Sequence, residues 1–275
     1  MQITKTKLET KKNIHKKIIH FSDIHFYKNY KEKKLQDIIE LVEKQKPDYV
    51  CITGDLLDTP QVTKLTEIQN YLNFYKDLGK LSKVIVILGN HDLFENHQTT
   101  KEYDDFLNKL KQTNNIYLLR NEKTEFEDIV FVSYEQMRDT YKKEEKKTNQ
   151  IEEDMIEKLP KASLEKYTVA LIHSPITLIK IRKRSYLKNY DLFLCGHTHD
   201  GILPIFLSKN INIHYGIVSP TKKLFPKNIR GIYLDTPNII INGGVVKFSK
   251  TAKILKKLDF LYPSSANIIE IDEKM

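Results

Sequence analysis

Two histidines one residue apart follow a short apolar run in the last third of the chain. The run 191–195 leads into Gly196, and His197 and His199 come next. Neutral imidazole is the commonest protein metal ligand, and a glycine lets the backbone turn tightly. A strand that ends here would bring both rings to one edge of a sheet, where a turn can aim them at one centre. By itself, the pair is equally consistent with two histidines on a solvent-exposed loop.

Four other apolar runs also end in polar residues. These ends carry Asp23 with His25, Asp55, Asn90 with His91, and His173. The runs alternate with segments of helical periodicity, which predicts an α/β fold. Because ligand sites in such folds lie beyond the carboxyl ends of the strands, we expect all five clusters to converge at one edge.

The types of these residues indicate a metal centre. The predicted ligands are Asp23, His25, Asp55, Asn90, His173, His197 and His199. Carboxylates mixed with imidazoles suit Mn, Fe or Zn. Seven ligands are too many for one catalytic ion with an open position, but they suit two divalent ions roughly 3.5–4 Å apart that share one carboxylate. Such a pair activates water and polarises phosphoryl oxygens, and His91 is suitably placed to donate a proton to the leaving oxygen.

The motifs recur in a recognisable order along the chain. They are Asp-x-His at 23–25, Gly-Asp-x-x-Asp at 54–58, Gly-Asn-His-Asp at 89–92, a lone His173 and Gly-His-x-His at 196–199. This set resembles the calcineurin-like metallophosphoesterases. The resemblance implies an α/β fold, a four-layer αββα sandwich of two mixed β-sheets flanked by helices.

The resemblance also implies a role for each site residue. Asp23, His25 and His199 would hold one metal, Asn90, His173 and His197 would hold the other, and Asp55 would bridge them. His91 would donate a proton to the leaving group or stabilise the transition state. Asp58 would orient His91, as a carboxylate fixes an imidazole tautomer in other enzymes.

Within this superfamily, the later part of the chain resembles the bacterial YkuE-like branch. The similarity lies in Gly-His-Thr-His, a following apolar loop with a proline, and Phe225-Pro-Lys-x-x-x-Gly-Ile-Tyr233. That branch usually continues Gly-Gly-Gln after the second histidine, where this chain has Asp200-Gly201-Ile202. Its glycine-rich strand near the end is altered here to Ile241-Asn-Gly-Gly-Val245. The predicted metal ligands are unaffected by these departures.

The pattern of apolar residues predicts the elements that position the site, within a single domain over 1–275. Strands are expected at 3–8 (an edge strand), 17–21, 49–53, 83–88, 116–119, 129–133, 168–172, 191–195, 231–234, 238–242 and 266–271. Helices are expected at 33–44, 64–78 and 101–112, with a basic amphipathic helix at 176–188. Residues 138–166 carry eight basic and eight acidic side chains, so we interpret them as an exposed, charged helical insertion with a structural role. Residues 201–231 are interpreted as a loop on the substrate side.

The net charge of +9 is concentrated in 1–22, 176–190 and 217–258. These segments are either solvated faces or a positive field that draws anionic substrates. The basic helix follows His173 and the apolar loop 201–207 follows His199, so both leave the rim of the predicted site. A basic amphipathic helix beside an exposed apolar loop is typical of binding to an anionic membrane, although the loop could instead pack into the domain. The best candidates for steering phosphate are Lys222, Lys223, Lys227 and Arg230.

The favoured function is hydrolysis of a phosphate ester by attack of metal-bound hydroxide, in an enzyme that depends on two divalent ions. The substrate hypothesis is a phospholipid or lipid-linked phosphate at a membrane surface. The alternatives are a phosphodiesterase or nuclease acting on nucleotides or nucleic acid, and a metal-binding scaffold without turnover. The predicted substrate is an anionic phosphate ester. Neither an obligate nucleic acid partner nor a protein partner is predicted.

Composition favours a cytoplasmic protein, with peripheral association at the inner membrane face as an added hypothesis. No run reaches the roughly 18 apolar residues that span a bilayer, and the lysine-rich start has no apolar signal-peptide core. Cys51 and Cys195 each lie in an apolar run, so we expect reduced, buried thiols. The histidines outside the motifs are expected to be structural or solvent-exposed: His15, His20, His97 and His214.

Overall fold

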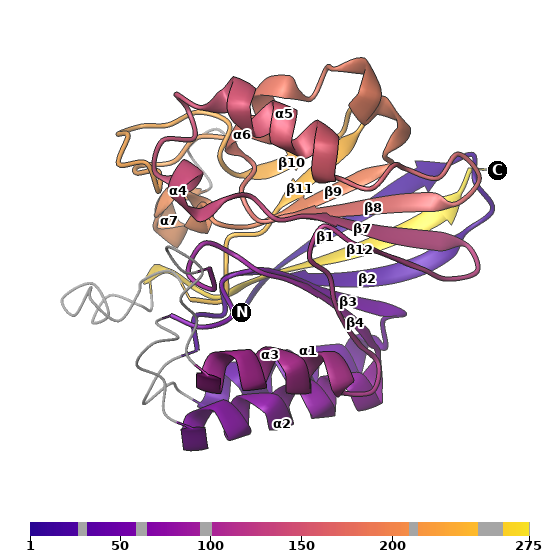
Figure 1. Ribbon diagram of the computed structural model, residues 1–275, viewed down its shortest axis with the longest axis vertical. Coiled ribbons are helices and arrows are strands. Elements are labelled where there is room, and N and C mark those ends of the chain that lie inside the picture. Colours follow the sequence, from indigo (N-terminus) through magenta and orange to yellow (C-terminus); the bar gives the residue numbers. More distant parts are fainter. Residues whose placement is uncertain (27–31, 59–64, 94–100, 209–213, 247–260, 275) are drawn as a thin grey trace.

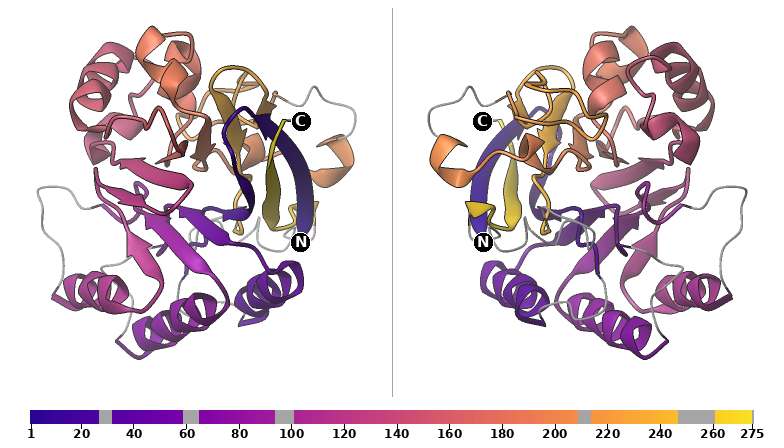
Figure 2. Two further views of the ribbon diagram at one scale, coloured as in Figure 1. Left: turned by 90° about the vertical axis from the view of Figure 1, so that its right-hand side faces the viewer. Right: turned by 90° about the vertical axis from the view of Figure 1, so that its left-hand side faces the viewer.

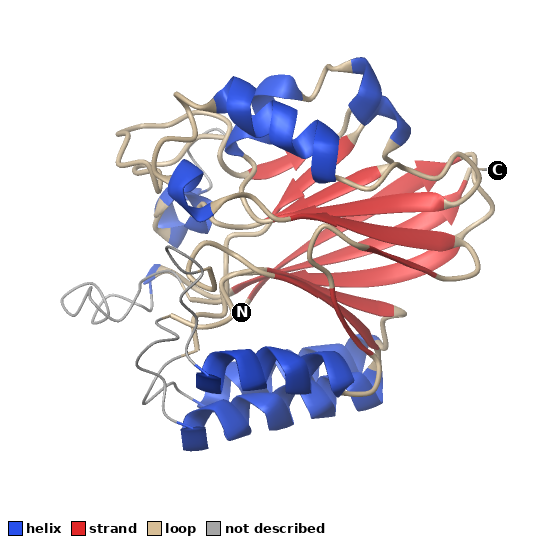
Figure 3. Ribbon diagram, in the orientation of Figure 1, coloured by secondary structure: helices blue, strands red, loops and turns tan. Residues whose placement is uncertain are grey.

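Two six-stranded β-sheets pack face to face in the computed structural model, and helices cover both outer faces (Figures 1 and 3). The structure describes residues 1–26, 32–58, 65–93, 101–208, 214–246 and 261–274. The order of the first sheet is β1 (Gln2–Thr10), β12 (Ser265–Glu273), β2 (His15–Phe21), β3 (Tyr49–Thr53), β4 (Lys83–Ile87) and β5 (Ile116–Leu118). The order of the second is β10 (Gly231–Tyr233), β11 (Asn238–Ile241), β9 (Leu192–Cys195), β8 (Tyr167–Ile172), β7 (Ile129–Tyr134) and β6 (Lys123–Glu125).

Both sheets are mixed, as predicted. In the first, β2 to β5 run parallel, while β12 is antiparallel to β2 and parallel to the edge strand β1. The first and last strands of the chain therefore lie side by side, with the two termini at opposite ends of the pair (Figure 2). In the second, β7, β8, β9 and β11 run parallel, and the edge strands β6 and β10 are antiparallel to their neighbours. The parallel strands of each sheet deliver their carboxyl ends to a common edge.

The helices complete four layers. The first sheet is covered by α1 (Glu32–Gln45), α2 (Leu65–Leu81) and α3 (Lys101–Gln112), and the second by α5 (Thr148–Lys158), α6 (Ile176–Ile181) and the 3₁₀ helix η3 (Ser185–Asn189). Two short helices lie in the loops on the left of Figure 1, α4 (Arg138–Tyr141) and α7 (Ile205–Ser208). The 3₁₀ helix η4 (His199–Gly201) follows β9. This arrangement confirms the αββα sandwich.

The burial of each element follows its sequence pattern. Ile38 and Val42, four residues apart on α1, are both fully buried, as one face of an amphipathic helix requires. Strand β3 is buried along its whole length because helices cover one face of its sheet and the second sheet covers the other, so it has a continuous apolar run rather than an alternating pattern. Cys51 and Cys195 are buried free thiols, as expected.

Two sequence interpretations were wrong. The basic amphipathic helix predicted at 176–188 is broken: α6 ends at Ile181, and η3 follows after a turn. Five of the six residues of α6 are buried, so it has no free apolar face. The charged segment 138–166 is not uniformly exposed, since Tyr141 and Glu144 are both buried. The short strand β6 was not predicted, and Lys64, the predicted start of the second helix, lies outside the described residues.

Among the described helices, none is both long and apolar enough to cross a membrane.

Candidate metal centre

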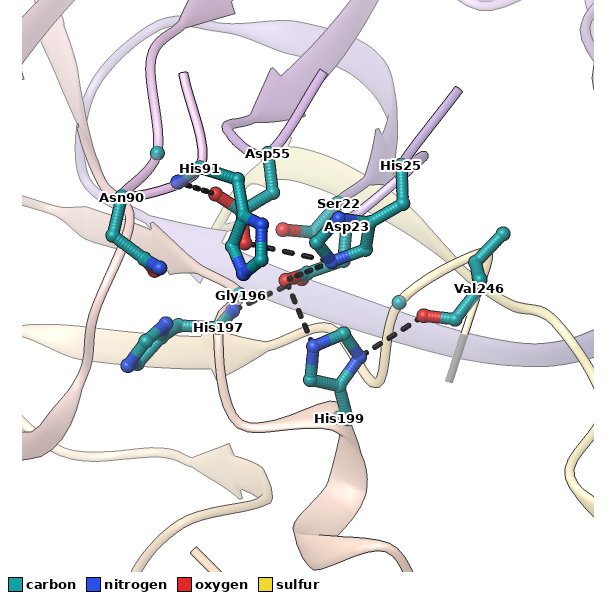
Figure 4. Close-up of polar contacts among 12 residues, drawn as sticks. Ser22, Asp23, His25, Asp55, Asn90, His91, Gly196, His197, His199 and Val246 are labelled. Carbon is teal, nitrogen blue, oxygen red and sulfur yellow. Dashed lines mark hydrogen bonds and ion pairs between the residues drawn. The ribbon is translucent and has the colours of Figure 1, made fainter. Parts of the chain in front are cut away.

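The predicted site residues meet where the carboxyl ends of β2, β3, β4, β8 and β9 come together between the two sheets. Figure 4 shows the side chains of His25, His91 and His199 gathered around Asp23 and Asp55. A pocket of about 390 Å³ opens over them. The convergence expected from five separate strand ends is therefore present in the structure.

One group of candidate ligands consists of Asp23, His25 and His199. Asp23 Oδ1 lies 3.5 Å from His199 Nε2 and 3.9 Å from His25 Nε2. His199 Nδ1 donates a hydrogen bond to the main-chain carbonyl of Val246 at 3.0 Å, which leaves its Nε2 as the acceptor nitrogen. Asp23 Oδ2 accepts the main-chain N–H of His197 at 2.9 Å. The remaining oxygen, Oδ1, is buried and accepts no hydrogen bond within the described part of the chain.

The second group of candidate ligands consists of Asn90, His173 and His197, beside Asp55. His173 Nε2 lies 3.3 Å from Asp55 Oδ2 and 3.2 Å from Asn90 Oδ1. Its Nδ1 donates to the main-chain carbonyl of Thr53 at 2.6 Å, so Nε2 faces the other ligands. His197 Nε2 is buried and has no hydrogen-bond partner among the residues described.

Asp55 lies between the two groups. Its Oδ2 is 3.3 Å from His173 Nε2 of the second group and 3.5 Å from His25 Nε2 of the first. Its Oδ1 accepts the main-chain N–H of His91 at 2.8 Å. A carboxylate in this position can be shared by two ions, which is the place predicted for Asp55.

The donor set fits divalent cations. Two donors bound to one ion at about 2.1 Å each lie roughly 3.0–3.4 Å apart, close to several of the separations above. Such separations are long for hydrogen bonds, and the buried Asp23 Oδ1 and His197 Nε2 have no hydrogen bond to compensate their burial. Each of His173 and His199 is oriented by a carbonyl on its other nitrogen, as is common for metal-ligating histidine.

Electrostatics favours the metal-binding protonation states at three of these residues. Burial lowers the pKa of both His25 and His197 well below the ordinary value, so both rings are neutral. Burial alone would raise the pKa of Asp55, but the neighbouring His173 and His91 hold it well below its usual range. Burial lowers the pKa of His173, but Asp55 outweighs this effect and raises it to about 9. A metal cation beside Asp55 would compete with the proton that this raised pKa keeps on His173.

Five ligand residues occupy the left-handed region of backbone space. Their φ angles are 51° at Asp23, 47° at His25, 53° at Asp55, 65° at His197 and 47° at His199. This conformation is uncommon for residues other than glycine, and such strain concentrates at functional sites. Here it lets each loop turn sharply and direct its ligand towards the centre.

Glycines allow these loops to approach each other closely. A Cβ on Gly196 would lie 1.7 Å from Ser22 Oγ and 2.7 Å from Asp23 Oδ2. A Cβ on Gly89 would lie 2.3 Å from Asp55 Oδ1. Any side chain at either position would therefore displace a metal ligand.

Asp92 supports the site in a way that sequence reasoning missed. It is buried, and its carboxylate accepts the main-chain N–H groups of Leu56, Leu57 and Gly89 at 2.9–3.0 Å. Asp92 thereby joins the loop that carries Asp55 to the loop that carries Asn90. Burial raises its pKa to about 7, with a further contribution from the charge of Asp55. The available signal was its place as the last residue of the Gly-Asn-His-Asp motif.

His91 lies at the edge of the pocket, but Asp58 orients it through a different atom from the one predicted. The ring Nδ1 of His91 donates to the main-chain carbonyl of Asp58 at 2.9 Å. The carboxylate of Asp58 lies beside His25 instead, with Oδ1 3.7 Å from Nδ1. Burial lowers the pKa of His91, but Asp55 and the Asp58 carbonyl outweigh it, so the net shift is upward and favours a ring that can donate a proton.

Two further segments line the pocket outside the candidate metal ligands. They are Tyr141 with Lys142, and the loop residues Ile202, Val218, Ser219 and Pro220. The Tyr141 ring lies 5.2 Å from that of His197, and burial raises the pKa of its hydroxyl well above 10, so the phenol is neutral. Nothing in the spacing of the charged segment 138–166 indicated that Tyr141 and Lys142 would reach the site.

Other residues singled out from the sequence lie away from the candidate metal centre. Lys222, Lys223, Lys227 and Arg230 do not line the pocket; Arg230 lines a separate cavity of about 320 Å³ together with Asp200. The described histidines outside the motifs contact other polar groups. His20 is buried beside Thr53, and His15 is exposed near Asp272. His214 donates to the Arg230 carbonyl, and His97 lies outside the described residues.

Known proteins with similar sequences share the family. Residues 16–201 match the family described as calcineurin-like phosphoesterase. An uncharacterized metallophosphoesterase of Campylobacter jejuni is 29% identical over 195 residues, which are 70% of this chain and 47% of that protein. An uncharacterized metallophosphoesterase of Aquifex aeolicus is 27% identical over 208 residues, 74% of this chain and 71% of that protein. The chain thus spans about half the length of the Campylobacter relative.

Among solved structures, the protein TT1561 of Thermus thermophilus aligns with a TM-score of 0.47 and 10% identity, covering 84% of this chain and 90% of that one. The family match covers more than half of the present sequence and includes every predicted metal ligand. The chain therefore belongs to the calcineurin-like phosphoesterase family.

Proposed function

We propose that the protein hydrolyses phosphate esters with two divalent metal ions, Mn, Fe or Zn, held at the ends of the central strands. The observation that carries the proposal is the position of Asp55, whose Oδ2 lies 3.5 Å from a nitrogen of one ligand group and 3.3 Å from a nitrogen of the other. A shared carboxylate between two mixed His/Asp groups is the arrangement that two-metal phosphoryl transfer requires. Asp23, His25 and His199 would hold one ion, and Asn90, His173 and His197 the other.

The residues around the metals perform the rest of the chemistry. When bound, the ions would polarise the phosphoryl oxygens and lower the pKa of the attacking water. His91 then provides the proton for the leaving oxygen: its Nδ1 is held by the Asp58 carbonyl, so its Nε2 is the nitrogen available to the pocket. The Asp58 carbonyl also favours the protonated ring, because it accepts the Nδ1–H hydrogen bond.

The test is hydrolysis of a nitrophenyl phosphomonoester and a nitrophenyl phosphodiester by metal-loaded and chelated protein. We expect turnover of at least one ester that disappears with chelator and returns with added metal. Asp55→Asn should abolish turnover, and Asp235→Asn, on an exposed residue, serves as the matched control. Turnover that persists in metal-free protein or in Asp55→Asn would contradict the proposal.

The second part of the proposal is that the enzyme works at an anionic lipid surface on a phospholipid or lipid-linked phosphate. Support comes from residues 222–227, here called the tip. Leu224 and Phe225 are 66% and 71% exposed, and the lysines of the tip (Lys222, Lys223 and Lys227) are exposed as well. Phe225 has a φ of 49°, which is strained for a bulky side chain. Exposed apolar side chains among lysines favour insertion into a negatively charged membrane interface.

The tip is connected directly to the pocket. Leu224 forms an antiparallel bridge with Val218, and Val218 lines the pocket. The loop 201–207 was considered either as a membrane contact or as part of the packed domain, and both occur within it. Leu203 is buried in the domain, whereas Ile205 and Phe206 are 40% and 60% exposed. The buried helix α6 does not contribute to such a surface, because its apolar residues pack inside the molecule.

Sedimentation with vesicles containing phosphatidylserine tests this part. At low salt, the wild type should sediment with these vesicles but not with neutral ones, and Leu224→Ser with Phe225→Ser should abolish binding. Leu234→Ser is the matched control, because Leu234 is 67% exposed but follows β10 at the end of the second sheet away from the pocket. Equal binding by all three proteins, or none by the wild type, would contradict the membrane role.

A further inference from the structure

Residues 135–147, here called the strap, join β7 to α5 and include α4. The strap is fixed to the metal centre by a fully buried carboxylate. Glu144 accepts the Ser174 hydroxyl at 2.7 Å and the main-chain N–H of Thr177 at 2.9 Å. Since Ser174 directly follows the ligand His173, this contact sets the height of the strap above the second group of ligands.

Further contacts hold the strap to three neighbouring segments of the chain. The Arg138 guanidinium donates to the main-chain carbonyl of Leu93, just beyond the motif that carries His91. On the other side, the Lys180 ammonium donates to the Glu145 carbonyl at 3.0 Å, and the Lys223 ammonium lies 3.4 Å from the Glu145 carboxylate. The strap is therefore attached to the metal-carrying loops and to the tip.

The strap supplies the positive charge of the pocket. Lys142 is the one Lys or Arg among the described residues that line it, and no described carboxylate lies within ion-pairing distance of its ammonium. Ile202, Val218 and Pro220 add apolar side chains to the lining. A ligand in this pocket would therefore meet candidate metal ligands, one cation and a group of apolar side chains.

We propose that Lys142 is a specificity-determining residue that favours phosphate esters with two negative charges over those with one, and that Glu144 is the positioning residue that holds it in place. The inference rests on the proposed phosphoesterase function. A phosphomonoester is largely dianionic above about pH 6, whereas a phosphodiester keeps one charge. Because the attraction of an ammonium scales with the charge it faces, Lys142 contributes more to binding the monoester. The apolar side chains of the lining receive the organic group of the ester.

The test compares phenyl phosphate with its matched diphenyl diester in wild type, Lys142→Met, Lys142→Arg and Lys143→Met. In Lys142→Met, kcat/KM should fall about tenfold for the monoester and no more than about twofold for the diester. Lys142→Arg should restore most of the monoester activity. Lys143→Met is the matched control, because Lys143 is an exposed neighbour that does not line the pocket. Metal content should be unchanged in all four proteins.

A binding measurement separates this inference from the proposed function. Calorimetric titration of inorganic phosphate into metal-loaded protein should show about tenfold weaker binding by Lys142→Met. If phosphate binding depends on Lys142 but the wild type hydrolyses neither ester, the role of Lys142 stands and the proposed function fails. If the wild type hydrolyses the esters and Lys142→Met loses nothing, or loses equally on both, the inference is overturned. A wild type that neither binds phosphate nor turns over overturns both.

For Glu144, the variant Glu144→Gln keeps the volume but offers one oxygen instead of two to Ser174 and Thr177. We expect a higher KM for the monoester, an unchanged KM for the diester and normal metal content. A general loss of stability or metal without this difference would show that Glu144 is structural only.

Discussion

At the scale of single residues, the clearest feature is that main-chain carbonyls orient the functional imidazoles. His173, His199 and His91 each donate Nδ1–H to a carbonyl, of Thr53, Val246 and Asp58 respectively. Each carbonyl fixes the tautomer and leaves Nε2 for the metal or the substrate. His91 is distinguished from the other two because its Nε2 faces the pocket without belonging to the two groups of predicted ligands.

This geometry predicts that His91→Ala lowers kcat by about 10² or more, since general acid catalysis contributes typically 10²–10⁴. The loss should depend on the leaving group. It should be large for a phenyl ester, whose oxygen needs a proton, and small for a nitrophenyl ester, whose oxygen leaves as a stable anion. Steady-state kinetics on the two esters checks this, with metal content as the control. Equal losses on both would mean that His91 does not act as the acid.

At this scale, the residues predicted as metal ligands lie together in the structure, because each follows an apolar run that forms a strand. The sequence did not predict how Asp58 and Asp92 act. Asp58 contacts His91 through its carbonyl, and Asp92 accepts three main-chain N–H groups from two loops. The direction of a main-chain N–H or carbonyl group depends on the conformation of the loop. The spacing of residues in the sequence does not predict that conformation.

At the scale of elements, the site depends on loops that turn immediately after buried strands and touch one another. Gly196 is the tightest of these contacts, since a Cβ there would overlap Ser22 Oγ and approach Asp23 Oδ2. The sharp turns also explain why five ligand residues have positive φ angles. Such loops hold the candidate metal ligands rigidly, because no loop can move without displacing the loop that it touches.

Gly196→Ala should therefore disturb the metal centre as well as the fold. We expect a destabilisation of about 1–3 kcal/mol, typical of overpacking, together with less bound metal per chain. Denaturant unfolding and elemental analysis measure the two effects. Gly79→Ala provides the control: its Cβ would lie 2.5 Å from the Asn114 carbonyl, far from the site on α2, so it should destabilise without changing metal content. Normal metal binding by Gly196→Ala would show that the loops relax independently.

The bounds of helices with a single apolar face were predicted well, whereas the bounds of the basic helix at 176–188 were not. The prediction of 101–112 agrees with α3, whose buried residues are Tyr103, Phe106, Leu107 and Leu110. In 176–188, the apolar residues cover nearly the whole circumference of α6, which is the pattern of a buried helix, and the arginines follow its end. The basic charge of 176–188 suggested one helix, whereas the structure has two separate elements there, α6 and η3.

At the scale of the whole molecule, a largely apolar cluster fills the space between the sheets, and a buried histidine lies near its candidate metal end. His20 lies there, fully buried, 2.8 Å from Thr53 Oγ1 and 3.3 Å from Asn267 Nδ2. Asn267 donates to one ring nitrogen and the other donates to Thr53, so the hydrogen bonds suit a neutral ring. Burial lowers the pKa of His20 to about 3.

This pKa predicts acid sensitivity of the fold. Because the folded pKa lies below the unfolded value of 6.5, the unfolded state binds the extra proton, and the stabilisation is complete above pH 6.5 and is lost as pH falls towards 3. At pH 5, His20 should contribute a loss of about 2 kcal/mol relative to pH 7. Denaturant unfolding of chelated wild type and His20→Gln should show a shallower pH dependence in the variant, since other buried histidines are common to both. Parallel profiles would contradict a neutral, buried His20.

The most direct test of the central claim is the number of metal ions bound per chain, measured by elemental analysis after reconstitution with Mn, Fe or Zn. A site in which Asp55 lies between two ligand groups predicts two ions in the wild type and in Lys143→Met. His199→Ala and His173→Ala should each lose one ion and retain the other, and Asp55→Ala should weaken both. A wild type that binds one ion, or variants that lose both ions together from either side, would contradict a dinuclear centre.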